Sequence, residues 1–142
     1  MGNAVDIRIA AGAEEIGLAM MLKDLLAQNM EQRPEKIPDF QKLSIDVGLI
    51  ISDAEVEITL SFSGGRLIIY PGLKKGAGLV ITAGSDTIMA LSNLKIKGGM
   101  PYYFDKTGRE VALAMVTGRL KVKGMLFHFP SLIRISRVMS VQ

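Results

Sequence analysis

Hydrophobic residues follow two different periods along the chain, and the change of period separates helical from extended segments. Over residues 13–30 they recur every three to four residues, which predicts a helix. Its polar stripe is narrow, so we expect this helix to be covered on more than one side. Over 42–63 the period is two, which predicts two strands joined by a turn near 52–54. Gly64-Gly65 then predicts a hairpin into a further strand over 66–70.

The second half of the chain predicts shorter elements. Glycine, proline and capping residues mark where each begins or ends. In chain order we expect a strand over 78–82, a helix over 86–93 capped by Ser85, a helix that opens on the capping-box spacing of Thr107 and Glu110 and stops at Gly118, a basic strand over 119–124, and a last helix opened by Pro130.

These elements predict an α+β fold in one domain spanning 1–142. Antiparallel alternation with one polar face is typical of a sheet that is covered on one side. A chain of 15.4 kDa buries about two thirds of its unfolded surface, so a core of this size needs no covalent staples.

Composition excludes several classes of function. The chain has no Cys and a single His, which excludes thiolate metal sites, thiol nucleophiles and His-rich metal centres. His128 has no acidic partner in any recognisable motif, and the loop over 72–78 lacks the ending of a phosphate-binding loop. We therefore expect no catalysis, no cofactor and no metal. No apolar run reaches 18 residues and no secretory signal opens the chain, so we expect a cytoplasmic protein.

Two groups of charged residues could in principle form a calcium site or a nucleic-acid site, and neither is expected to. Asp53, Glu55 and Glu57 lack the glycine-punctuated loop of a calcium site, so we interpret them as a solvated sheet face. Basic residues alternate along 119–124 and again at 95–97, with Tyr102, Tyr103 and Phe104 nearby. Single-strand binders need exposed stacking aromatics, whereas these are expected to be at least half buried, so nucleic acid is not an expected partner.

Charge is divided unevenly along the chain. The net charge of +3 combines −6 over 1–64 with +9 over 65–142. Either the two halves neutralise each other in the fold, or the basic half meets something anionic, for which a transient contact with an anionic membrane surface is the expected case.

The predicted helices and one face of the predicted sheet are strongly apolar. Methionine is frequent among these apolar residues, with nine in the chain. Methionine fills irregular cores and adaptable apolar sites alike. An ordinary Met-rich core is one interpretation, and an apolar cavity for a lipid is the other. The residues expected to converge on such a cavity are Met20, Val56, Ile58, Leu60, Phe62, Met89, Met115, Leu132 and Ile135.

The order of elements, together with Gly118-Arg119-Leu120-Lys121-Val122-Lys123-Gly124, resembles the sterol carrier protein type-two family. Residues 21–43, 58–65 and 132–141 resemble its short microbial members, and the resemblance covers about 14–141. It implies a five-stranded antiparallel sheet covered on one face by helices, with an apolar tunnel between them. The chain departs from the family over 95–107, which is longer and more aromatic.

The resemblance implies binding and transfer of an apolar lipid without catalysis. The ligand would be a fatty acyl chain, an acyl-CoA, a sterol or a phospholipid. Two alternatives stay open: a non-enzymatic interaction module of the same fold with a filled core, and an accessory subunit of an enzyme acting on a lipid thioester. The oligomeric state is left open as well.

Overall fold

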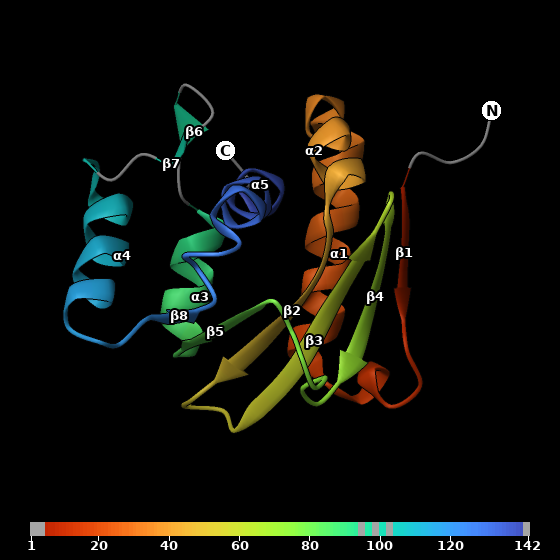
Figure 1. Cartoon of the computed structure of the whole chain (residues 1–142), viewed down its shortest axis with the longest axis horizontal. Helices are drawn as coiled ribbons and strands as arrows, with labels where there is room; N and C mark the ends of the chain where they lie inside the picture. Colours follow the sequence, from red (N-terminus) through yellow and green to blue (C-terminus); the bar gives the residue numbers. More distant parts are fainter. Residues whose placement is uncertain (1–4, 94–95, 98–99, 102–103, 141–142) are drawn as a thin grey trace.

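The main sheet of the described part of the chain has six strands. A computed structural model describes residues 5–93, 96–97, 100–101 and 104–140 (Figure 1). The strand order is β1-β4-β3-β2-β5-β8. The strands are β1 (Asp6–Ile9), β2 (Ser44–Ile51), β3 (Val56–Ser63), β4 (Arg66–Pro71), β5 (Leu79–Ala83) and β8 (Lys121–Lys123), and a separate two-stranded sheet pairs β6 (Ile96–Lys97) with β7 (Met100–Pro101).

The sheet is mixed, so the prediction of five antiparallel strands is wrong in number and direction. The β2–β3 and β3–β4 hairpins are antiparallel, and the predicted turn at Gly64-Gly65 joins the second pair. By contrast, β1 pairs in parallel with β4, and β5 pairs in parallel with β2. The four residues of β1 alternate too briefly to signal a strand, and their partner lies about sixty residues later in the chain.

The parallel return to β5 follows from the loop that connects it to β4. The hydroxyl of Thr59 donates to the Gly72 carbonyl (2.8 Å) and accepts from the Lys74 amide (2.9 Å), which holds the loop across the polar face of β3. Leu73 then lies over Gly48, where an added Cβ would come within 2.9 Å of its Cδ2. The chain therefore crosses over β3 and β2 and enters β5 in the direction of β2.

Five helices accompany the sheet: α1 (Gly17–Gln32), α2 (Ile37–Lys42), α3 (Ser85–Ser92), α4 (Lys106–Val116) and α5 (Phe129–Met139). Short 3₁₀ turns precede α1 and α2 at Ala13–Glu15 and Pro34–Lys36. The helix predicted over 13–30 is therefore interrupted: Ile16 has the extended ψ of 110° and separates the 3₁₀ turn from α1. Gly118 follows α4 with a φ of 79°, and Pro130 lies in the first turn of α5, as predicted.

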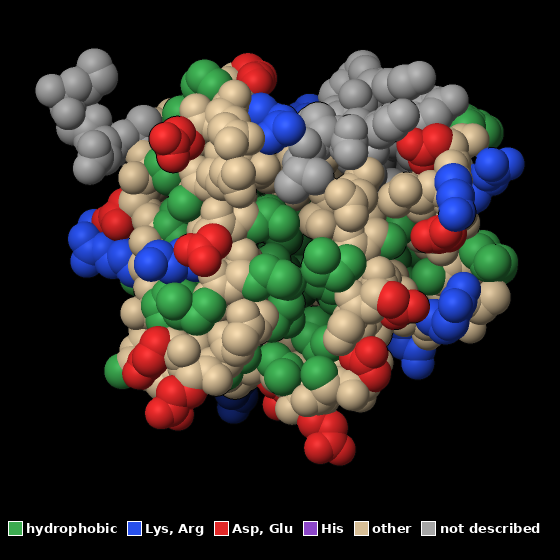
Figure 2. All heavy atoms as spheres, turned by 180° about the vertical axis from the view of Figure 1, so that it is seen from behind, with side chains coloured by type: hydrophobic (Ala, Val, Ile, Leu, Met, Phe, Trp, Pro, Cys, Tyr) green, Lys and Arg blue, Asp and Glu red, His purple; other side chains and the backbone are tan. Residues whose placement is uncertain are grey.

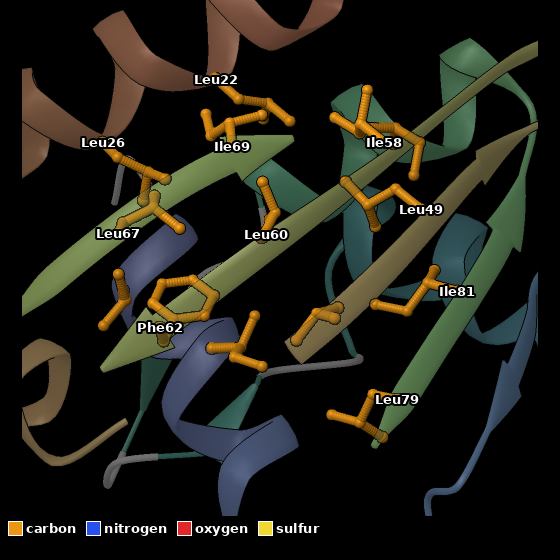
Figure 3. Close-up of a cluster of buried hydrophobic side chains, with 14 of the residues drawn as sticks. Leu22, Leu26, Leu49, Ile58, Leu60, Phe62, Leu67, Ile69, Leu79 and Ile81 are labelled. Carbon is orange, nitrogen blue, oxygen red and sulfur yellow. The ribbon is translucent and has the colours of Figure 1, made fainter. Parts of the chain in front are cut away.

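The helices divide the apolar face of the sheet into two halves. Leu22 and Leu26 of α1 point toward Ile69 and Leu67 of β4 and make a solid layer (Figure 3). The rings of Phe40 on α2 and Phe62 on β3 meet edge to face, with their centroids 5.9 Å apart. The other half of the face, on β2, β5 and β8, is left to α3, α4 and α5 (Figure 1).

Two helix caps differ from the sequence prediction. The carboxylate of Asp53, in the turn after β2, accepts hydrogen bonds from the Ser85 amide (3.0 Å) and hydroxyl (2.8 Å), so the cap of α3 comes from a distant residue. These bonds lower the pKa of Asp53. Asp105 caps α4 by accepting from the Gly108 amide (2.7 Å), in place of the predicted Thr107 box. Glu55 lies in the turn with a φ of 52°, and not on the strand face assigned to it.

Candidate apolar ligand site

A cavity of about 260 Å³ lies between the uncovered half of the sheet and helices α3, α4 and α5. Its walls are almost wholly apolar, and Ser136 is the polar residue among the described lining residues. Typical ligand pockets measure about 300–1,000 Å³ and are lined mainly by apolar side chains. The cavity lies just below this range, which suits a narrow apolar chain better than a bulky ligand.

The floor of the cavity comes from neighbouring strands in register. Val47 of β2 pairs with Leu60 of β3, and Leu49 of β2 lies beside Ile81 of β5. Ile81 in turn pairs with Val122 of β8. Because side chains of paired residues point to the same face, these five residues form one continuous apolar surface.

The helices close the cavity with residues at helical spacing. Ile88 and Leu91 come from one face of α3, and Val111 and Met115 from one face of α4. The largest share comes from α5 and the turn before it: Met125, Phe129, Leu132, Ile133, Ile135, Ser136 and Met139, with Leu120 completing the wall beside β8.

The lining offers no group for acid–base or nucleophilic chemistry. The hydroxyl of Ser136 donates a hydrogen bond to the carbonyl oxygen of Leu132 (3.0 Å), so its hydrogen-bond donor is used within α5. No charged side chain lines the described wall, so a polar headgroup has no partner inside. Such a cavity favours a ligand that places its apolar part inside and its polar part at the surface.

The mouth of the cavity is marked by residues that line it and are also exposed. Met115, near the end of α4, is 38% exposed, and Phe129, at the start of α5, is 47% exposed. The opening therefore lies between the C-terminal turn of α4 and the N-terminal turn of α5.

The far end of α5 is held firmly. The side-chain amide of Asn29 donates to the carbonyl oxygens of Val138 and Ser140, both at 3.1 Å. Asp39 of α2 pairs with Arg137 at 2.9 Å. These contacts fix the C-terminal half of α5 across the cavity.

Four residues predicted for the site line this cavity: Leu60, Met115, Leu132 and Ile135. Val56 and Met89 instead line a second hollow between α1 and α3, together with Met21 and Ile88. Figure 2 shows hydrophobic side chains gathered on this back face around a hollowed region. Ile88 borders both the cavity and the hollow.

The other three predicted residues lie elsewhere. Ile58 and Phe62 share the apolar face of β3 with Leu60, but both are buried in the core and line neither the cavity nor the second hollow. Met20 is half-buried on α1 and lines neither space. The alternation of Ile58 and Phe62 is the same as that of Leu60, so this pattern alone does not distinguish core residues from cavity residues.

Several lining residues were not singled out from the sequence, among them Val47, Leu49, Ile81 and Ile88. The available signal was strand alternation, since Val47 and Leu49 alternate with polar residues as Val56 and Ile58 do. Leu120 and Val122 alternate with the basic residues of 119–124, and both line the cavity.

The basic strand does not neutralise the acidic half of the chain. Lys121 and Lys123 project from the sheet face opposite the cavity, while Glu57 lies on β3, three strand spacings or about 14 Å away. Within the described ranges, neither lysine forms an ion pair. Tyr102, Tyr103 and Lys95 lie outside the described residues. Phe104 is 80% exposed, so the expectation that this aromatic residue is at least half buried is wrong.

In the described part of the chain, no three carboxylate or imidazole side chains come together as they would around a metal ion. Across the same residues, no helix combines the length and hydrophobicity that crossing a bilayer requires.

Comparison with known proteins bears on the fold. No protein-family model matches the sequence, and no curated protein matches it. A solved structure described as a UbiJ-SCP2 ubiquinone synthesis protein is similar, with a TM-score of 0.62 and 11% identity over 89% of this chain and 95% of that one. A crystal structure of sterol carrier protein 2 is similar with a TM-score of 0.51 and 14% identity, covering 82% and 88%. The predicted resemblance is thus confirmed in three dimensions, as a likeness of fold to the sterol carrier protein 2 domain.

Proposed function

We propose that the chain binds the apolar part of a lipid in the cavity between the sheet and α3–α5, and transfers it without catalysis. The observation that carries the proposal is a cavity of about 260 Å³ whose described lining is apolar apart from Ser136. A fatty acyl chain, alone or in acyl-CoA or a phospholipid, is the class that a narrow cavity favours over a sterol.

The energetics agree with reversible binding. Burying one methylene group is worth about 0.8 kcal/mol, so a chain of about sixteen carbons yields roughly 12 kcal/mol before costs. Association and ordering cost several kcal/mol or more. A net value near −8 kcal/mol corresponds to a dissociation constant of about 1 μM. Affinity of this order holds a lipid and still releases it.

A second ligand chemistry has one observation in its favour. The structural neighbour with a TM-score of 0.62 is described as a ubiquinone synthesis protein. An isoprenoid chain is also long and apolar, so an isoprenoid quinone belongs among the ligands to be tested.

Displacement of a fluorescent fatty acid tests the proposal with a matched pair of variants. Met115→Trp and Met89→Trp both replace a partly exposed helical methionine, at 38% and 44% exposure, but only Met115 lines the cavity. We expect Met115→Trp to abolish fatty-acid binding and Met89→Trp to retain it. Equal binding by both variants would contradict the assignment.

Analysis of lipid carried through purification separates the proposal from its alternatives. Extraction with organic solvent and mass spectrometry of the wild type should yield a lipid that Met115→Trp lacks. A module with a filled core, serving only as a partner-binding surface, would carry none. An accessory subunit of a thioester enzyme would bind acyl-CoA and leave free fatty acid unbound.

A further inference from the structure

The cavity and the second hollow share one described lining residue. The hollow between α1 and α3 measures about 320 Å³, and its wall includes Ile51, Val56 and Met89. Of the described residues that line it, Ile88 alone also lines the cavity of about 260 Å³. At this point, therefore, the thickness of a single side chain separates the two spaces.

The two spaces follow each other along β2. Val47, Leu49 and Ile51 are alternate residues of this strand and point to the same face of the sheet. Val47 and Leu49 form part of the cavity floor, and Ile51 lines the hollow. The hollow therefore continues the apolar floor of the cavity beyond Ile88.

The hollow lies at the end of β5 away from the turn that leads to Phe129. That turn begins at Gly124, where an added Cβ would overlap the carbonyl of Gly78, just before β5. At the other end of β5, Ala83 pairs with Ile51, a lining residue of the hollow. A chain that enters beside Phe129 and keeps its polar end at the surface therefore extends its methyl end toward the hollow.

Ile88 is held in place between the two spaces. It is 5% exposed and lies in the first turn of α3, where its amide donates to the Gly84 carbonyl at 3.1 Å. The hydrogen bonds from Ser85 to Asp53 fix this turn of the helix to the turn after β2. A β-branched side chain in a helix keeps one preferred χ1 rotamer, so Ile88 forms a stiff partition, unlike the neighbouring Met89.

We infer that Ile88 sets the longest acyl chain that the cavity accepts, because it closes the cavity off from the hollow. A smaller residue at this position would join the two spaces, and the methyl end of a longer chain would then lie in the hollow. The inference rests on the proposed function, since it concerns the length of the same apolar ligand.

A matched pair of variants tests the inference on the full chain with a series of saturated fatty acids. Ile88→Ala and Ile81→Ala each remove about three carbon atoms from a buried part of the cavity wall, but Ile81 does not line the hollow. Both variants should accept up to about three more methylenes than the wild type, and only Ile88→Ala should accept more. At about five carbons beyond the wild-type limit, the gain in affinity should be roughly tenfold larger for Ile88→Ala, since each methylene contributes about fourfold.

Filling the hollow supplies the second half of the test. Met89→Trp puts a larger side chain into the wall of the hollow and should leave the limit of the wild type unchanged. Combined with Ile88→Ala, it should remove the roughly tenfold gain, and combined with Ile81→Ala it should change nothing. Equal limits in the two alanine variants, or a gain in Ile88→Ala that Met89→Trp leaves intact, would overturn the inference.

A milder pair of variants serves if an alanine variant does not fold. Ile88→Met and Ile81→Met keep the volume of the cavity wall, and cores tolerate such exchanges well. The flexible methionine at position 88 can turn aside into the hollow, so Ile88→Met should accept longer chains and lose this gain when combined with Met89→Trp. Ile81→Met should keep the wild-type limit. The same limit in both methionine variants would contradict the role of Ile88.

Binding by the wild type separates this role of Ile88 from the proposed function. A wild type that binds no fatty acid of any length overturns both. A wild type with a defined limit on chain length, extended equally in the two alanine variants, overturns only the role of Ile88.

Discussion

Lys36 donates a hydrogen bond of 2.7 Å from its Nζ to the carbonyl oxygen of Ser140, the residue that follows α5. The same ammonium group donates to the carbonyl oxygen of Arg137 at 2.5 Å. Lys36 is only 7% exposed, and burial lowers its pKa. A buried cation thus donates to two backbone carbonyls at the negative end of α5, the helix that lies across the cavity.

Replacing Lys36 by methionine should destabilise the fold through α5. The substitution keeps the length of the side chain and removes the donor of two hydrogen bonds to backbone carbonyls at the end of α5, at a cost of about 1–3 kcal/mol. Urea unfolding followed by circular dichroism would measure the loss. Lys42→Met, at an exposed position at the end of α2, is the control and should change stability by less than about 0.5 kcal/mol. Similar stability of the two variants would contradict the anchoring role.

Acid should remove the contribution of Asp53. Hydrogen bonds from Ser85 lower the pKa of Asp53 below its ordinary value of 3.8, so the ionised carboxylate stabilises the fold above pH 3.8. This stability is lost as the pH falls through the lowered value. Asp53→Asn should therefore have a lower urea midpoint than the wild type at neutral pH, and the gap should close in acid.

Asp24→Asn, at an exposed position on α1, serves as the control for that measurement and should show no such gap. A difference between wild type and Asp53→Asn that stays constant from neutral pH into acid would mean that the charge of the cap is not what stabilises α3.

Gly124→Ala should cost much more stability than Gly118→Ala. Both glycines have positive φ, of 90° and 79°, so an alanine at either position costs about 1–2 kcal/mol in backbone energy. At Gly124 the added Cβ would also overlap the backbone carbonyl of Gly78, whereas at Gly118 it meets open space. We expect a loss of about 3 kcal/mol or more for Gly124→Ala, measured by thermal unfolding. Equal losses would show that β8 can move away from β5 at no cost.

Affinity should depend on chain length up to a limit set by the cavity. In a series of saturated fatty acids, each methylene should improve binding about fourfold until the cavity is filled, after which affinity levels off. Leu49→Ala enlarges the cavity and should move that limit to longer chains. Leu67→Ala, in the solid half under α1, should cost about 2–5 kcal/mol of stability without moving the limit. If affinity levels off at the same chain length in Leu49→Ala as in the wild type, the fatty acid does not bind in this cavity.

The sequence predicted local structure well because hairpins and amphipathic helices are encoded by near neighbours. The β2–β3–β4 meander follows from alternation, the C-terminal end of α4 from Gly118, and the start of α5 from Pro130. The direction of β5 could not be predicted in this way, since it depends on the contacts of Thr59 that hold the loop over the sheet. The cap of α3 depends on Asp53, a residue 32 positions before Ser85.

The lining of the cavity was only partly predictable for a related reason. Ile58, Leu60 and Phe62 alternate identically, yet only Leu60 lines the cavity. Strand alternation defines which face is apolar, and the helix packed above decides whether that face is filled or hollow. The placement of α1 over β4 is a tertiary property that no local pattern carries.

Both edges of the six-stranded sheet are short and charged. At one edge, β1 has four residues, and Asp6 pairs with Arg8 and Arg66. At the other edge, β8 has three residues, of which two are lysines. Pairing of β8 with the same strand of a second copy would bring lysines together, and both edges offer few backbone hydrogen bonds, which is how natural sheets resist growth into fibrils. Leu126 and Phe127, which are exposed in the turn after β8, therefore lie beside a sheet edge that does not act as a template for β-aggregation.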